Sequence, residues 1–202
     1  NNVTVTGTLI DSTVVTYTPS ITHQLAAPGP DSSVGKSASS ADKGAPDQVV
    51  GGDINYTLNI SNTGNVTEDQ LLEDAIPNAL NVNQINTGAA ASVDYQKNGV
   101  NTWITGVTLG SSIAVNGTNF PTFSGGDYVS RLRFRFNNVP PTTSNSAGLR
   151  ATVINPPHGG GANALPFSLN NTASVQTIYN NTVVNTKTDA INFEIVPTTP
   201  TV

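Results

Sequence analysis

Three polar residues lie at positions where a β-strand predicts an inward-facing apolar side chain. Successive side chains of a strand point to opposite faces, and this alternation places Lys36, Asp74 and Asn171 in the apolar phase of the stretches SVGKSAS, LLEDAI and SLNNTASV. Burying a lone charge is costly, so an inward-facing lysine requires a partner. Burial also lowers the pKa of an amine and raises that of a carboxylic acid, so a neutral Lys36 amine could act as a nucleophile while Asp74 polarises the Asn171 amide.

A simpler arrangement uses the same three residues without covalent chemistry. Lys36 and Asp74 can form an ordinary ion pair, with Asn171 hydrogen-bonded to the backbone. Strand phase alone does not decide between the two arrangements, and Lys43 replaces Lys36 if the first strand is shifted along the chain. Lys187 and Asp189 also fall in an apolar phase, but there we expect a frayed strand start.

Alternating patterns of this kind run through most of the chain. GDINYTLNISNTGN (52–65) predicts a half-buried strand ended by a turn, and SRLRFRFNNVPP (130–141) alternates inward apolar side chains with outward arginines. A solvated face explains the arginine row better than a heparin or nucleic-acid site, because no second basic element accompanies it. The residues expected in the core are Tyr56, Leu58, Leu132, Phe134 and Phe136.

The remaining predicted strands cover 3–9, 13–18, 33–39, 69–76, 103–109, 148–154 and 189–196. Long loops rich in Pro, Gly, Ser and Asn connect them, at 22–33, 110–128 and 155–166. Many strands joined by turn-rich loops predict an all-β sandwich.

The composition is closer to a secreted β-protein than to a cytosolic enzyme. The 202-residue chain is 36% hydrophobic, enough for one sizeable core, but only 10% charged. A net charge of −5 and scattered basic residues make nucleic acid and anionic membranes poor partners. The chain lacks the run of about 18 apolar residues that membrane insertion by a helix needs. Because it begins at Asn1 rather than Met, we expect secretion with a cleaved leader.

Most candidate motifs for catalysis, cofactor binding or metal binding lack a residue or a spacing that the chemistry requires. PPHGGGAN contains the His-Gly-Gly-Gly of some esterase oxyanion holes, but the chain has no G-x-S-x-G nucleophile motif, so a loop is expected. Cysteine is absent, which removes disulfides and thiolate metal sites. His23 and His158 lack metal-ligand spacing, and Asp42, Asp47 and Asp53 do not follow a calcium loop, although an irregular calcium site at loop ends stays open. We therefore expect no enzyme activity, no cofactor and no metal site.

Four motifs in order resemble the conserved-repeat domain of bacterial and archaeal surface proteins. They are GGDINYTLNISNTGN, LLEDAIPNALNV, SGGDYVSRLRFRF and LNNTASV. The patterns typical of the family are G-D-x-x-x-Y-T, N-T-G-N, D-x-x-P and, near its end, N-x-A-x-V. The resemblance covers about residues 33–177, with longer loops around 110–124 and 140–166. It implies an immunoglobulin-like sandwich used as a stalk, adhesin or filament module, and not an enzyme.

The resemblance also implies a role for the inward-facing polar residues. In isopeptide-forming domains of similar surface proteins, a first-strand lysine attacks the carboxamide of a last-strand asparagine while an acidic residue relays protons. Carried over to this chain, the lysine is Lys36, the asparagine is Asn171 and the acid is Asp74. Ammonia leaves, and an amide cross-link remains.

Two segments lie outside the resembled module, an N-terminal extension (1–32) and a C-terminal extension (178–202). NNVTVTGTL (1–9) alternates Val3, Val5 and Leu9 and predicts a donor strand that leaves its own domain to complete the sheet of a neighbour. AINFEIV near the C-terminus has the same alternation. Head-to-tail addition of this kind builds a homopolymer, which predicts an extracellular filament subunit.

Two other functions fit the same sequence. One is a stalk domain of a tandem-repeat surface adhesin, with surface glycans or host cells as partners. The other is a carbohydrate-binding module in which Trp103, Tyr95 and Tyr128 form a stacking surface.

Several asparagines occur in the Asn-x-Ser/Thr pattern of glycosylation sites. Asn55, Asn59 and Asn170 are the ones that strand phase places outward, so a glycan could be attached to them without entering the core.

Overall fold

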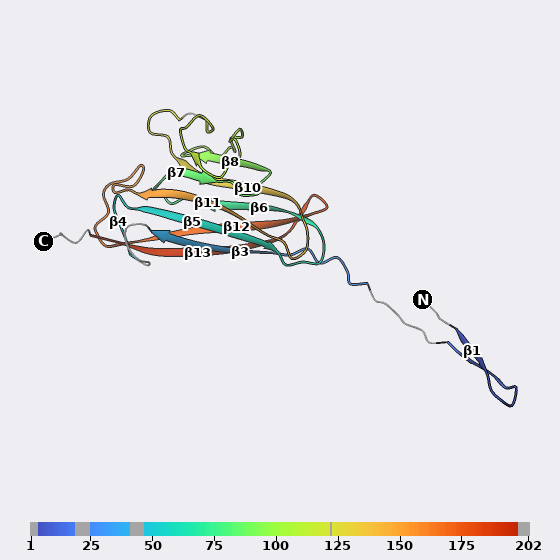
Figure 1. Ribbon diagram of the computed structural model, residues 1–202. Helices are drawn as coiled ribbons and strands as arrows, with labels where there is room; N and C mark the ends of the chain where they lie inside the picture. Colours follow the sequence, from blue (N-terminus) through green and yellow to red (C-terminus); the bar gives the residue numbers. More distant parts are fainter. Residues whose placement is uncertain (1–3, 19–24, 41–46, 122, 198–202) are drawn as a thin grey trace.

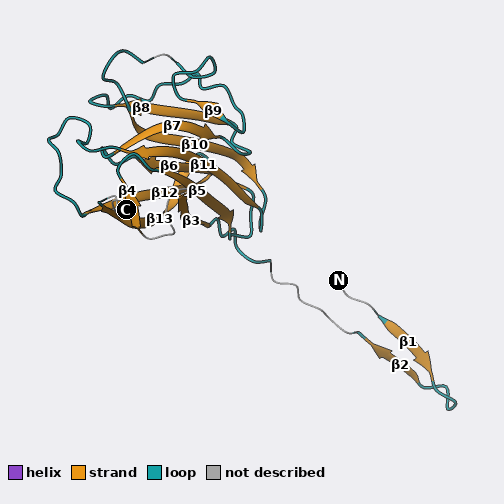
Figure 2. Cartoon of the chain, turned by 60° about the vertical axis from the view of Figure 1, so that its left-hand side comes forward, coloured by secondary structure: helices purple, strands orange, loops and turns teal. Residues whose placement is uncertain are grey.

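The computed structural model describes residues 4–18, 25–40, 47–121 and 123–197. These residues form two β-sheets packed face to face and a separate N-terminal hairpin, with no helix among them (Figures 1 and 2). The predicted class, an all-β immunoglobulin-like sandwich with long loops and extra terminal strands, is confirmed.

One sheet has six strands in the order β4-β13-β12-β6-β10-β8. Its members are β4 (Asp47–Val49), β13 (Thr182–Val196), β12 (Phe167–Tyr179), β6 (Glu68–Ala75), β10 (Val129–Val139) and β8 (Ser92–Lys97). All neighbours are antiparallel except β4, which runs parallel to β13.

The second sheet has five antiparallel strands in the order β3-β5-β11-β7-β9. Its members are β3 (Ser32–Ser40), β5 (Asp53–Asn62), β11 (Ser144–Val153), β7 (Leu80–Asn86) and β9 (Ile113–Ala114). The first strand of the sandwich, β3, therefore belongs to a different sheet from the last two strands, β12 and β13.

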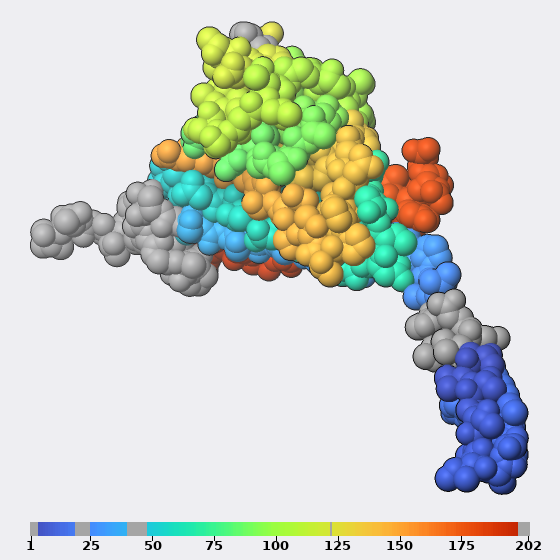
Figure 3. Space-filling model, turned by 45° about the vertical axis from the view of Figure 1, so that its right-hand side comes forward, coloured from blue at the N-terminus to red at the C-terminus, as the bar shows by residue number. Residues whose placement is uncertain are grey.

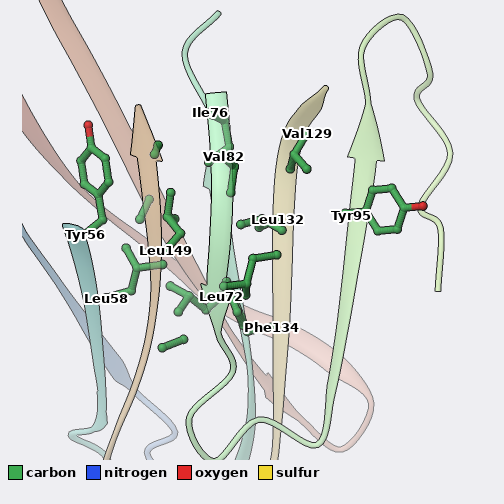
Figure 4. Packing of buried hydrophobic residues seen from close by; sticks show 14 of the residues in the cluster. Tyr56, Leu58, Leu72, Ile76, Val82, Tyr95, Val129, Leu132, Phe134 and Leu149 are labelled. Atoms are coloured by element: carbon green, nitrogen blue, oxygen red, sulfur yellow. The ribbon is translucent and has the colours of Figure 1, made fainter. Parts of the chain in front are cut away.

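Apolar side chains from the inner faces of both sheets fill the space between them (Figure 4). β5 shows the cause most clearly, because buried and exposed side chains alternate along it as the sequence predicts. All five predicted core residues are buried, namely Tyr56, Leu58, Leu132, Phe134 and Phe136. Fully burying side chains of this size contributes about 1.5–3 kcal/mol each.

The sandwich reaches further along the chain than the predicted range of 33–177. β13 pairs with β12 from Thr182 to Ile195 and buries Phe193 and Ile195 in the same core. The AINFEIV stretch is therefore part of its own sandwich rather than a free terminal strand.

The strand predicted at 103–109 is wrong. Only Ile104 forms a bridge, to Tyr95, and the rest of the segment is irregular. Gly106 has a φ of 104°, a left-handed conformation that interrupts the extended backbone. The sequence pattern also missed β7 and β8.

The N-terminal hairpin consists of β1 (Val5–Thr8) and β2 (Val14–Tyr17), and it lies away from the sandwich (Figure 1). Val5 pairs with Tyr17 and Gly7 with Val15, so the three larger side chains share one face. This apolar face is uncovered, since Val5, Val15 and Tyr17 are 58%, 48% and 68% exposed.

Candidate functional site

Lys36, Asp74 and Asn171 all project into the interior of the sandwich, from both sheets. Lys36 projects from β3 of the five-stranded sheet, while Asp74 and Asn171 project from the neighbouring strands β6 and β12 of the six-stranded sheet. Asp74 lies opposite Ala173 in the β6–β12 pair, so Asn171 is two residues along the same face. The side chains of Lys36 and Asp74 are 0% exposed, and Asn171 is equally buried.

The lysine and the aspartate are in direct contact. Lys36 Nζ donates a hydrogen bond of 2.5 Å to Asp74 Oδ1, while Asp74 Oδ2 has no partner. Nζ also lies 5.0 Å from the centre of the Tyr56 ring. The ion-pair half of the simpler arrangement is thus present.

The other half of that arrangement is absent, because the Asn171 amide makes no hydrogen bond. Both Asn171 Nδ2 and Asn171 Oδ1 are buried without a partner. The Tyr56 hydroxyl lies beside this amide, and its interaction with Asn171 opposes the rise that burial gives the pKa of Tyr56, but the two groups form no hydrogen bond of ordinary geometry. An orphaned buried amide costs about 1–3 kcal/mol.

Burial moves the proton affinities of the lysine and the aspartate towards each other. It lowers the pKa of Lys36, against the opposing attraction of Asp74, and it raises the pKa of Asp74, against the attraction of Lys36. Both shifts lower the cost of transferring the proton from Lys36 to Asp74, the step that would give a neutral amine and a neutral carboxylic acid. Burial also raises the pKa of the Tyr56 phenol, which keeps it neutral.

A neutral amine and a carboxylic acid beside an amide are the groups that aminolysis of the amide requires. The amine is the nucleophile, the acid can donate to the carbonyl oxygen, and the amide nitrogen can leave as ammonia. The side chains of Lys36 and Asp74 are 0% exposed, so a substrate from solvent cannot reach them. Any such reaction is therefore confined to the chain's own groups.

Asn171 departs from the resembled pattern in one respect. It lies on β12, the penultimate strand, and its register partner on the last strand, β13, is Ile191. A cross-link from Lys36 would therefore join the first strand of the sandwich to its penultimate one.

Polar residues at the start of β13 hold the first strand in place, so the expectation of a frayed strand start is wrong. Asp189 Oδ2 accepts a 2.6 Å hydrogen bond from the backbone N–H of Lys36. Lys187 Nζ lies 2.7 Å from the Asp31 carboxylate, which also accepts from Asn185 Nδ2 at 2.6 Å. Their apolar phase was the signal in the sequence that they face β3.

The predicted donor-strand residues lie in the hairpin. Val5 and Leu9 are exposed, at 58% and 56%, and contact no other sheet. Val3 and the alternative nucleophile Lys43 lie outside the described residues. β1 pairs with β2 rather than standing alone, so the unit available for a neighbour is a hairpin and not a single strand.

The predicted glycosylation sites Asn55, Asn59 and Asn170 are all exposed on the outer faces of the sheets. Asn55 and Asn59 lie on β5. Asn170 on β12 differs from them, because its Nδ2 donates a 2.6 Å hydrogen bond to Asn192 Oδ1.

The three aromatic residues of the predicted stacking surface are engaged with other side chains. Tyr95 is buried and packs against Phe120, with ring centres 4.7 Å apart. Tyr128 is stacked on His158 at 3.8 Å, and the Arg133 guanidinium lies 4.2 Å from the centre of the Trp103 ring.

The described residues contain no group of three or more His, Cys, Asp or Glu side chains placed to hold a metal ion. No helix among them is long and apolar enough to cross a membrane.

Comparison with known proteins gives only distant structural likeness. No protein-family model and no curated protein matches the chain. The full-length major pilin SpaD from Corynebacterium diphtheriae is similar with 15% identity and a TM-score of 0.38, over 80% of this chain and 34% of the pilin. The MSCRAMM ACE of Enterococcus faecalis, which binds its ligands by the collagen Hug model, is similar with 13% identity and a TM-score of 0.38, over 96% of this chain and 60% of ACE.

A family 123 glycoside hydrolase from Clostridium perfringens is also similar, with 10% identity and a TM-score of 0.34, over 81% of this chain and 27% of the hydrolase. The chain thus spans about a third of SpaD and 60% of ACE. Likenesses this weak carry no argument about function, which must come from the site.

Proposed function

We propose that this protein is a non-enzymatic, extracellular structural protein, a subunit of a surface filament whose sandwich is locked by an isopeptide bond between Lys36 and Asn171. The observation that carries the proposal is the orphaned, fully buried Asn171 amide beside the buried Lys36–Asp74 pair. A protein that carries load between cells or along a fibre benefits from a covalent bond between its two sheets.

Without the cross-link, Lys36, Asp74 and Asn171 would lower the stability of the folded protein. A buried ion pair is often no better than apolar side chains of the same volume. The Asn171 amide adds the cost of two unpaired polar atoms. The cross-link replaces a charged pair and a primary amide with a secondary amide and a protonated Asp74, which are both neutral, so it removes the buried charges.

The reaction balances within the cluster. Lys36 transfers a proton to Asp74, and the neutral Nζ forms a bond with Asn171 Cγ while Asp74 donates to the carbonyl oxygen. When the tetrahedral intermediate collapses, the bond from Cγ to Nδ2 breaks and ammonia leaves with a proton that came from Nζ. Asp74 takes back the proton that it donated to the oxygen and ends as the neutral acid, and the event occurs once per chain rather than as turnover.

The proposed assembly rests on a different part of the molecule, the uncovered apolar face of the N-terminal hairpin. A two-stranded hairpin is marginally stable in water, so a hairpin with exposed Val5, Val15 and Tyr17 gains stability by joining a larger sheet. The proposed partner is a second copy of this chain.

The sandwich offers a matching edge. β13 is paired along its length with β12, but on its other side β4 covers only Glu194–Val196, so no described strand pairs with residues 182–193 there. Figure 3 shows the β12–β13 tip projecting at the end of the sandwich from which the N-terminal extension leaves. A hairpin added to this edge of the next copy would repeat head to tail and build a filament.

Intact-mass measurement of the purified, folded protein tests the cross-link directly. The wild-type chain should be lighter than its sequence by ammonia, and Lys36→Ala should abolish the link between Lys36 and Asn171 in a peptide map. A wild-type map in which both residues occur in unlinked peptides leaves only the ion pair. A cross-linked chain that stays monomeric at all concentrations would favour the adhesin-stalk alternative over the filament.

A further inference from the structure

A second buried polar cluster lies on the same inner face of β3, four residues before Lys36. Ser32 on β3, Glu68 and Gln70 on β6 and Thr177 on β12 are between 0% and 3% exposed. None of the ion pairs among the described residues includes Glu68. The cluster therefore buries a carboxyl group beside hydroxyl and amide groups without a cation to balance it.

The hydrogen bonds converge on the Ser32 hydroxyl. Ser32 Oγ donates to Glu68 Oε1 at 2.6 Å, and it accepts from Gln70 Nε2 at 3.0 Å. Gln70 Nε2 also donates to Glu68 Oε1, at 3.0 Å. Thr177 Oγ1 donates to the same Ser32 Oγ at 2.7 Å. The proton of Ser32 is thus directed at a carboxylate, which is the arrangement of a hydroxyl nucleophile with its general base.

The electrophile is also near the Ser32 hydroxyl. Because the C–N bond of an amide is about 1.3 Å long, a nitrogen 3.0 Å from Ser32 Oγ places the Gln70 carbonyl carbon no more than about 4.3 Å from that oxygen. Gln70 Oε1 and Glu68 Oε2 are buried without partners. Gln70, like Asn171, is thus a buried carboxamide whose carbonyl oxygen is not held by the fold.

From this geometry we infer that Ser32 and Gln70 form an ester cross-link. The Ser32–Glu68–Gln70 cluster has the same three functions as Lys36, Asp74 and Asn171, namely a nucleophile on β3, an acid on β6 and a carboxamide on the six-stranded sheet. The inference does not depend on the Lys36 site, because the two clusters share no residue.

The step balances in atoms and protons. Ser32 Oγ forms a bond with Gln70 Cδ, and Glu68 takes the hydroxyl proton. Glu68 then returns that proton to Nε2 as the bond from Cδ to Nε2 breaks, so ammonia leaves and the carboxylate is restored. Loss of ammonia to solvent drives the exchange of amide for ester.

The bond would join the two sheets where the N-terminal extension enters the sandwich. Ser32 is the first residue of β3, and Gln70 lies near the start of β6 in the other sheet. Thr177 faces Gln70 across the β6–β12 pair but bonds to Ser32, so its role is to orient the nucleophile.

The chemistry of esters gives a test that the Lys36 site cannot mimic. We expect a protease digest of the folded wild-type protein to contain a linked peptide with Ser32 and Gln70. Alkaline hydroxylamine applied after denaturation should split it, because hydroxylamine cleaves esters and, apart from Asn-Gly bonds such as Asn98-Gly99, spares amides. In the Lys36→Ala background, the intact chain should still be one ammonia lighter than its sequence.

Two variants separate a failed reaction from a failed fold. Ser32→Ala and Glu68→Gln should each remove the linked peptide, and Glu68→Gln keeps the shape of the cluster. The matched control Thr177→Val, which removes only the orienting hydroxyl, should slow the reaction but leave the link between Ser32 and Gln70. Unlinked Ser32 and Gln70 peptides from folded wild-type protein, or a link that survives hydroxylamine, would overturn the inference.

Discussion

Replacing Asn171 with leucine should change the free energy of unfolding in opposite directions with and without the cross-link, so the sign of the change shows which arrangement is present. Leucine is close to asparagine in shape but has no amide, and the substitution leaves the contact between Lys36 and Asp74 in place. Without a cross-link, Asn171→Leu removes two unpaired buried polar atoms, so the free energy of unfolding should stay the same or rise by about 1–3 kcal/mol.

With a cross-link, the same substitution should strongly destabilise the protein. A bond from Lys36 to Asn171 closes a loop of about 135 residues, and by analogy with a disulfide of that span it stabilises the folded chain by about 5 kcal/mol. Asn171→Leu should lower the free energy of unfolding by about that amount, because the cross-linked protein has no orphaned amide left whose removal would offset the loss.

Urea unfolding followed by the fluorescence of Trp103, the single tryptophan of the chain, measures the change. The urea dependence should also steepen in the variant, because an unlinked chain exposes more surface when it unfolds. In a Lys36→Met background no cross-link can form, so adding Asn171→Leu there should not destabilise the protein further. A single variant as stable as wild type would refute the cross-link.

Three other predictions concern assembly, acid stability and glycosylation. Deleting residues 1–18 should convert a polymerising protein into soluble monomers, as measured by light scattering and electron microscopy. The double variant Val15→Lys, Tyr17→Lys should do the same, because it makes the hairpin face polar. Polymers of the truncated chain would contradict hairpin addition. The hydrogen bond from Lys187 lowers the pKa of Asp31 below its ordinary 3.8, so the stability that Asp31 contributes should be present above that value and lost as the pH falls through the lower, folded pKa. Asp31→Asn should flatten this part of the stability profile, and an unchanged profile would mean that the contact with β13 contributes nothing. In a glycosylating host, Asn55 and Asn59 should carry more glycan than Asn170, whose amide is held by Asn192, and glycopeptide mapping that finds Asn170 as fully occupied would show that this bond is no obstacle.

Strand phase was sufficient to identify the inner face of the sandwich. The alternation in GDINYTLNISNTGN and SRLRFRFNNVPP correctly predicted which side chains are buried, including Tyr56 and Phe134. It also singled out Lys36, Asp74 and Asn171, because a polar residue in an apolar phase is visible from its nearest neighbours along the chain. Both results depend only on the period of two that every β-strand shares.

Strand pairing could not be read in the same way. That β13 completes the six-stranded sheet, and that Lys187 and Asp189 hold the first strand, depends on contacts between residues about 150 positions apart. The Ser32 cluster is also invisible in the sequence, since serine, glutamine and threonine are common on outward faces and SSVG gives no strong phase at its first residue.

The sequence by itself therefore determined an all-β sandwich and the inward direction of its reactive side chains, because both follow from the local geometry of an extended chain. Tertiary structure decided which of those side chains touch. Contact across a sandwich requires a strand order and a register, and these are set by the packing of the whole core rather than by any one strand. Lys36 reaches Asp74 only because β3 of one sheet packs beside β12 and β13 of the other, and Asn171 lies two residues from Ala173 on the same face only because β12 pairs with β6 in the register that puts Ala173 opposite Asp74.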